Sequence, residues 1–455
     1  MTPANNKSPQ PGAHPRPGST NLSWRFVLRA LNYRNYRLFF SGQSVSLIGT
    51  WMTRVATSWL VYRLTHSAWL LGVIGFAGQI PTFLLGPFAG VWVDRWNRHR
   101  TLVVTQVLSM LQSFALAVLA LRGSITVNEI LWLSLAQGII NAFDMPARQA
   151  FVIEMVENRE DLGNAIALNS SMVNAARLLG PSIAGVIIAA AGEGYCFLID
   201  GFSYMAVIAS LLMMRLIAAS RPRAHKAVFE ELREGWSYAS RSLPIRSLLL
   251  LLAMVSLVGM PYTVLMPIFA AQVLHGGAHT LGFLMGASGV GALAGAIFLA
   301  ARRSVLGLGR VVPIAAAIFG AGLIAFGFSP YLWLSLALML FVGGAMMTQM
   351  AASNTILQTI VEDDKRGRVM SFYSMAFMGM APFGSLLAGT LAARIGAPRT
   401  VRFTGSVCIV GAAAFAFCLP AIRKVVRPIY AGLGILPEVA VGIQAATALQ
   451  TPPED

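Results

Sequence analysis

Repeated long apolar runs constrain this chain more than any other feature. A helix needs about 20 predominantly apolar residues to cross a bilayer, and barrel strands are too short and too alternating in polarity to explain such runs. The sequence therefore predicts an all-α polytopic membrane protein with twelve transmembrane helices. We expect the spans near residues 38–61, 68–93, 101–120, 130–151, 165–191, 195–216, 248–274, 279–301, 310–328, 331–353, 369–393 and 400–421.

The placement of the charges predicts the orientation of these spans. Only 11% of the residues are charged, and the formal net charge is +16. If the N-terminus is cytoplasmic, most of the 34 Lys and Arg residues fall in the tails and loops on the inner face, as the positive-inside rule requires. We therefore expect a multi-pass protein of the cell inner membrane with both termini in the cytoplasm. Charge spread over the loops of one membrane face does not indicate nucleic-acid binding.

An internal repeat divides the chain into two halves. Residues 147–163 align with 352–368, so that Val156-Glu157 falls on Val361-Glu362. Duplication of a six-span unit explains this, and it predicts two pseudo-symmetric six-helix bundles. The predicted organisation is a disordered cytoplasmic tail with an interfacial helix (1–37), an N-terminal bundle (38–217), a cytoplasmic linker with an amphipathic helix (218–247), a C-terminal bundle (248–422) and a cytoplasmic tail (423–455).

Several chemistries have no motif in this sequence. None of the four lysines follows a glycine, which excludes a Walker A loop and hence ATP-driven transport by the chain itself. There is no G-x-S-x-G hydrolase elbow and no H-E-x-x-H metal motif. The three cysteines lie in apolar stretches without a C-x-x-C pair. We therefore expect no enzymatic activity, no cofactor and no metal. The energy for transport would come from a gradient across the membrane.

Three segments resemble the major facilitator superfamily. Residues 90–100 (GVWVDRWNRHR) are similar to its loop motif between spans two and three, with Asn97 in place of the second glycine. We expect Asn97 to keep that glycine's left-handed backbone. Residues 144–151 (DMPARQAF) and 174–185 (NAARLLGPSIAG) resemble the branch that contains the enterobactin exporter and macrolide-efflux-like proteins. One departure is Ser134, which stands where many antiporters of the superfamily carry an Arg.

The resemblance implies two conformational devices. One is a gating loop in which Asp94 would latch onto the start of span eleven and hold one state; the alternative is that Asp94 only pairs with Arg98. The other is an interface between the halves, formed by the glycine-rich spans two, five, eight and eleven. The residues assigned to the loop are Gly90, Asp94, Arg95, Arg98 and Arg100, and those assigned to the interface are Gly180, Pro181 and Gly185.

Charged side chains within the spans are costly and therefore functional by default. We expect Asp144 to form a charge network with Arg148 and Arg177 that couples transport to protons; the alternative is a permanent salt bridge that only locks spans four and five. Arg54 and Asn174 are assigned to the substrate cavity. Snorkelling of Arg54, or its pairing with Asp200 in span six, remains an alternative.

Together these features predict a secondary active transporter. It would export an amphipathic small molecule, siderophore-like or drug-like, by alternating access in exchange for protons, and it would work as a monomer. An uncoupled facilitator or lipid flipper of the same fold is the first alternative, because Ser134 replaces the motif Arg. A membrane sensor or scaffold that does not transport is the alternative from another class.

The charge pattern gives a direct prediction of topology. Both termini and residues 218–247 should be cytoplasmic, whereas His275, between spans seven and eight, should lie outside. Reporter fusions truncated at these positions measure the side of the membrane. A fusion at His275 that reports from the cytoplasm would contradict the assignment.

Overall fold

The computed structural model describes residues 28–156, 158–215, 228–302 and 304–435. Within these ranges the elements are helices joined by short connections, and no strand occurs. The prediction of an all-α protein is confirmed. The predicted N-terminal tail up to residue 27, residues 216–227 with the first part of the predicted linker, and the predicted C-terminal tail from 436 lie outside the described residues.

The first half begins earlier than the sequence suggested. A 3-10 turn, η1 (Arg29–Asn32), is followed directly by the first long helix. Tyr36 fixes this start, because its hydroxyl donates to the carbonyl of Ala165 at 2.8 Å and draws the segment onto α7. The helices are α2 (Arg34–Thr65), α3 (Ala68–Ala77), α4 (Ile80–Arg95), α5 (Arg98–Leu121), α6 (Val127–Met155), α7 (Arg159–Ala191) and α8 (Glu193–Leu212).

The second half begins with α9 (Val228–Arg241), which lies in the predicted linker. The last helix continues to Gly432, ten residues into the segment assigned to a tail, because Pro428 is accommodated within it. The remaining elements are α10 (Leu243–Met254), η2 (Val255–Gly259), α11 (Tyr262–Ile268), η3 (Phe269–Val273), α12 (Ala278–Ala300), α13 (Leu308–Phe326), α14 (Leu332–Ile360), α15 (Asp363–Ser374), η4 (Met375–Gly379), α16 (Ala381–Ile395) and α17 (Ala397–Gly432).

Three predicted spans are interrupted where proline removes a backbone donor. The second span breaks between α3 and α4, just before Pro81. The seventh contains the π-helical segments η2 and η3 on either side of Pro261 and Pro267, and the eleventh contains η4 just before Pro382. Proline in a helix frees a carbonyl of the preceding turn, and local π geometry accommodates it.

Ten segments of the described chain are long and apolar enough to cross a membrane. The helices α2 and α6 are not among them, although they have 32 and 29 residues. Both carry charge inside the helix, Arg54 in α2 and Asp144 with Arg148 in α6. The charged side chains that lower the hydropathy of these two helices are the ones that the candidate site uses.

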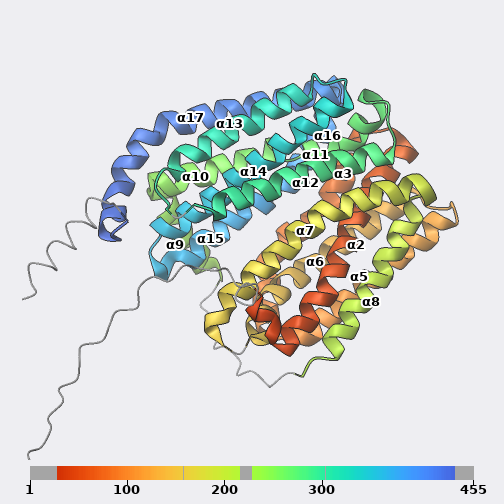
Figure 1. Ribbon diagram of the computed structural model, residues 1–455, viewed down its shortest axis with the longest axis horizontal. Helices are drawn as coiled ribbons and strands as arrows, with labels where there is room; N and C mark the ends of the chain where they lie inside the picture. The colour runs from red at the N-terminus through yellow and green to blue at the C-terminus, as the bar shows by residue number, and fades with distance from the viewer. Residues whose placement is uncertain (1–27, 157, 216–227, 303, 436–455) are drawn as a thin grey trace, which may run out of the picture.

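The two halves meet where α3 lies near α16 and α7 lies beside α12 (Figure 1). Glycines form the closest backbone approaches of both contacts, near one end of the helices. A Cβ on Gly72 of α3 would lie 2.9 Å from the Cα of Gly389 in α16. A Cβ on Gly185 of α7 would lie 2.9 Å from the Cα of Gly282 in α12. The internal repeat relates these contacts, because Leu71-Gly72 aligns with Leu281-Gly282. The halves are therefore joined by two copies of one small-residue crossing.

The opposite ends of the halves are held differently. Arg98, at the junction of α4 and α5, pairs with Glu154 of its own half at 2.8 Å. Arg368 of α15 pairs with Glu234 of α9 at 2.7 Å. Every ion pair recorded between described residues stays within one half. Among the described residues, the halves are therefore held together by the glycine crossings and by side-chain contacts such as that of Phe83 with Phe383, and not by ion pairs.

The crossings predict a conformational effect of a single methyl group. Gly185→Ala should disfavour this conformation, because the new Cβ would press on the backbone of α12, including the carbonyl of Ala278 at 2.9 Å. Spin labels at Arg100→Cys and Lys365→Cys, in a background without the native cysteines, report the separation at the other end. We expect a shift toward shorter distances. Gly86→Ala is the control, since a Cβ there meets no atom within 4 Å; identical distance distributions in both variants would contradict this account.

Candidate functional site

The candidate site lies among the charged side chains of the first half. Asp144 of α6 is buried, with 3% of its surface exposed. Its carboxylate accepts hydrogen bonds from Arg148 at 2.6 Å, Thr105 at 2.9 Å and Gln106 at 2.7 Å. The donors from α5 carry no motif that the sequence could have revealed. Because Arg148 stands one turn away on the same helix, movement of the halves as rigid bodies does not separate this ion pair.

Arg177 does not join that network in the structure, contrary to the expectation. Its guanidinium lies 5.8 Å from the ring centre of Trp51, and the guanidinium of Arg54 lies 4.7 Å from the same ring. The cause is the packing of α2 on α7, in which Gly180 leaves room for Trp51. The indole then stands beside Arg177, while Asp144 is already surrounded by three donors. Sequence analysis did not identify Trp51.

Asp200 of α8 forms no direct ion pair among the described residues, although the charge of Arg54 acts on its carboxylate from a distance. It is 1% exposed, and it accepts from the hydroxyls of Thr53 at 2.8 Å and Ser113 at 2.9 Å. The alternative that Arg54 pairs with Asp200 is therefore not realised, because Thr53 occupies the carboxylate and the adjacent Arg54 turns to Trp51. Asp200 ties α2, α5 and α8 together through neutral donors.

Asn174 lies one turn before Arg177 on α7 and is half-buried. Its amide donates to the carbonyl of Ser170 on its own helix at 2.9 Å. The motif glycines that follow have separate partners. Gly180 packs against Trp51 within the first half, whereas the carbonyl of Pro181 and the backbone of Gly185 pack against Gly282 of the second half.

The gating loop adopts a helix cap in place of the expected turn. Asn97 has φ −75° and ψ 108°, which is extended backbone, so the predicted left-handed conformation is wrong. Its side chain instead accepts from the N–H of Arg100 at 3.0 Å and caps α5, a role for which Asn is favoured. Arg95 and Arg100 are exposed, and a Cβ on Gly90 would meet open space. Asp94 lies in the last turn of α4, and its side chain is outside the described part.

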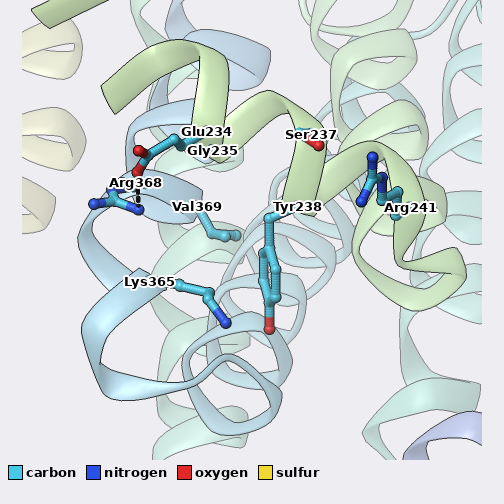
Figure 2. Close-up of a pocket in the computed structure, with 8 residues that line it drawn as sticks. All are labelled: Glu234, Gly235, Ser237, Tyr238, Arg241, Lys365, Arg368 and Val369. Atoms are coloured by element: carbon cyan, nitrogen blue, oxygen red, sulfur yellow. Dashed lines mark ion pairs between the residues drawn. The ribbon is translucent and has the colours of Figure 1, made fainter. Parts of the chain in front are cut away.

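A separate cavity of about 360 Å³ lies between α9 and α15. Figure 2 shows Glu234 and Arg368 paired at one side, with the ammonium of Lys365 turned toward Tyr238. That ammonium lies 4.8 Å from the centre of the Tyr238 ring. The cavity therefore marks where the linker helix rests on the second half, away from the charges of the first. In the described ranges no group of His, Cys, Asp and Glu could hold a metal ion.

Comparison with known proteins decides the family. The sequence profile of the transmembrane secretion effector family, a branch of the major facilitator superfamily, matches residues 28–428. The chain belongs to this family. The predicted resemblance is confirmed, and this major facilitator protein is a multi-pass membrane protein of a transporter family, not of an enzyme family.

Similar proteins include a transporter of one siderophore and an exporter of another. The staphyloferrin A transporter of Staphylococcus aureus is 25% identical over 376 residues, which cover 82% of this chain and 94% of that protein. The enterobactin exporter EntS of Shigella boydii is 24% identical and covers 82% and 88%. The multidrug efflux pump Tap of Mycolicibacterium fortuitum is 26% identical and covers 76% and 86%.

Solved structures agree on the fold of this major facilitator protein. A bacterial homologue of the human lysosomal transporter Spinster, in an inward-facing and unoccupied conformation, superposes with a TM-score of 0.67. It is 14% identical, with coverage of 88% of this chain and 98% of that chain. The nucleoside transporter NupG superposes with a TM-score of 0.64 at 14% identity, over 87% and 99% of the two chains. At such identities the likeness concerns the fold alone.

Proposed function

We propose that this chain is a monomeric secondary active transporter of the inner membrane that exports an amphipathic small molecule by alternating access. The observation that carries the proposal is the joining of the halves by glycine crossings at one end only. A contact that consists of close glycine crossings and edge-on phenylalanine rings, without ion pairs among the described residues, can open by a small rotation of one half against the other. The siderophore and drug transporters among its relatives support this type of substrate.

The orientation given by the positive-inside rule assigns a state to this conformation. Under that rule Arg98 and Arg368 are cytoplasmic, and the crossings at Gly72 and Gly185 lie toward the outer face. We propose twelve spans, with α2 and α6 added to the ten apolar segments, because each is long enough to cross. The conformation is then inward-facing, the state in which an exporter accepts its substrate from the cytoplasm.

The proposed coupling mechanism is exchange for protons at Asp144. The carboxylate is buried, and a proton that displaces Arg148 would change the charge of the site. Arg177 would respond to that change from the neighbouring helix. The intrahelical position of Arg148 favours a second candidate, an uncoupled facilitator or lipid flipper, because rotation of the halves leaves the pair intact. Asp200 is the comparison site, equally buried and without a direct ion pair among the described residues.

A first experiment identifies the cargo and then tests coupling. Efflux is compared between deletion and complemented cells for a siderophore and several hydrophobic drugs. The compound exported is then used in proteoliposomes, where the wild type should release protons as substrate moves. Asp144→Asn should abolish uphill export and retain counterflow, because the binding surface is unchanged. Asp200→Asn is the matched control. An Asp144→Asn protein of normal abundance that still drives pH-dependent uphill export would assign coupling elsewhere.

The latch at Asp94 remains a proposal for the opposite state. When the cytoplasmic ends close, Asp94 at the end of α4 would meet α15 near Arg368–Ser371, where the guanidinium of Arg368 favours a carboxylate. Asp94→Asn should then lower turnover severalfold while substrate affinity stays within about twofold, since only a conformational equilibrium shifts. Turnover and binding are measured on the same preparation, with Asp94→Glu as the charge-preserving control. Unchanged turnover in Asp94→Asn would exclude the latch.

A further inference from the structure

Two arginines of the first half lack a carboxylate partner. The guanidinium groups of Arg54 and Arg177 both lie against the indole of Trp51, at 4.7 and 5.8 Å from its centre. In the described part of the chain neither forms an ion pair. Unpaired charge at membrane depth is costly, so its retention indicates a use.

The carboxylates of the first-half spans are already engaged. Asp144 pairs with Arg148, and Glu193 at the start of α8 pairs with Arg63 at 2.8 Å. Asp200 is held by the hydroxyls of α2 and α5. Neutralising Arg54 or Arg177 from within this half would require breaking one of these sets of contacts.

The second half has no carboxylate to offer within its membrane helices. The sequence contains no Asp or Glu from residue 243 to residue 361, nor from residue 365 to residue 432. The acidic residues between these stretches, at 362–364, stand at the start of α15. Rotation of the second half therefore cannot bring a counter-ion from its spans to Arg54 or Arg177. A direct ion-pair partner for the two guanidinium groups would therefore come from outside the spans of this chain.

Both arginines are directed to the region between the halves. Val45 is 52% exposed and lies nine residues before Arg54, which places the two on opposite faces of α2. The exposed Arg54 side chain lies over the same Trp51 ring as Arg177, so the two guanidinium groups stand close to one position. Arg177 directly precedes the segment of α7 that meets α12, where the Cα of Leu178 would lie 3.0 Å from a Cβ on Gly289.

We propose that Arg54 and Arg177 bind a carboxylate of the exported molecule, so that the substrate is an amphipathic organic anion. This assignment rests on the proposed export function and names its substrate class. Stacking on Trp51 orients both guanidinium groups without neutralising them. Their N–H edges remain available for the paired hydrogen bonds that a carboxylate accepts. Asn174, one turn before Arg177, adds a neutral donor near the same position.

The test compares one compound with and without its charge. The probes are dansyl-L-glutamate and its dimethyl ester, titrated against the full-length protein in nanodiscs of uncharged lipid, with dansyl fluorescence as the readout. The wild type should bind the acid about tenfold more tightly than the ester, the difference expected for charge-assisted hydrogen bonds. Arg54→Gln and Arg177→Gln should each lower the affinity for the acid and leave that for the ester unchanged.

Matched variants separate recognition from folding. Arg402→Gln removes another guanidinium stacked on an aromatic ring, 4.2 Å from the centre of Phe328, and should leave binding of both probes unchanged. Arg54→Lys keeps the charge without the planar fork and should retain part of the preference for the acid. Equal binding of acid and ester, undetectable binding of the acid, or unchanged acid affinity in both glutamine variants would overturn the proposal. Export of a neutral drug by the wild-type chain would then leave the proposed function standing.

Discussion

The close approach of helix backbones at two glycine crossings is the contact on which this architecture depends. In a bilayer the lipid is as apolar as the helices, so association relies on close packing and not on the removal of water. Gly72 against Gly389 and Gly185 against Gly282 allow that packing, because a Cβ at any of the four would press on backbone. The approach of Leu178 to Gly289 continues the same crossing of α7 and α12.

The charges are distributed unequally between the halves. The first half contains the buried carboxylates and arginines, whereas the membrane helices of the second half after Arg246 are nearly free of charge. Substrate recognition by charge would therefore belong to the first half. The second half would be the part that rotates. Its membrane helices are apolar, and three π-helical segments interrupt their regular α-helical hydrogen bonding. The interior of a cell is electrically negative, so an anionic substrate would also leave down the electrical gradient. That driving force does not require proton exchange at the Asp144–Arg148 pair, which rotation of the halves leaves intact.

The linker helix α9 packs on α15, the helix that the proposed latch would use. Trp236 of α9 packs on Phe372 of α15, with ring centres 5.9 Å apart, and Glu234 pairs with Arg368. Arg368 and the residues that follow it in α15 are also the proposed partner of Asp94. In this conformation the linker helix therefore contacts the segment of α15 that Asp94 would bind in the opposite conformation.

The sequence by itself determined the membrane class, the helices, the family and the pair Asp144–Arg148. Each depends on local information: apolar runs of spanning length, or residues one helical turn apart. Only the tertiary structure decided the partners of Arg177, Arg54 and Asp200, because these depend on how α2 rotates against α7 and α8. That rotation follows from the packing of Trp51 on Gly180, which no spacing in the sequence encodes. Asn97 shows the same limit, since a single residue fits either a left-handed turn or a helix cap, and the start of α5 selected the cap.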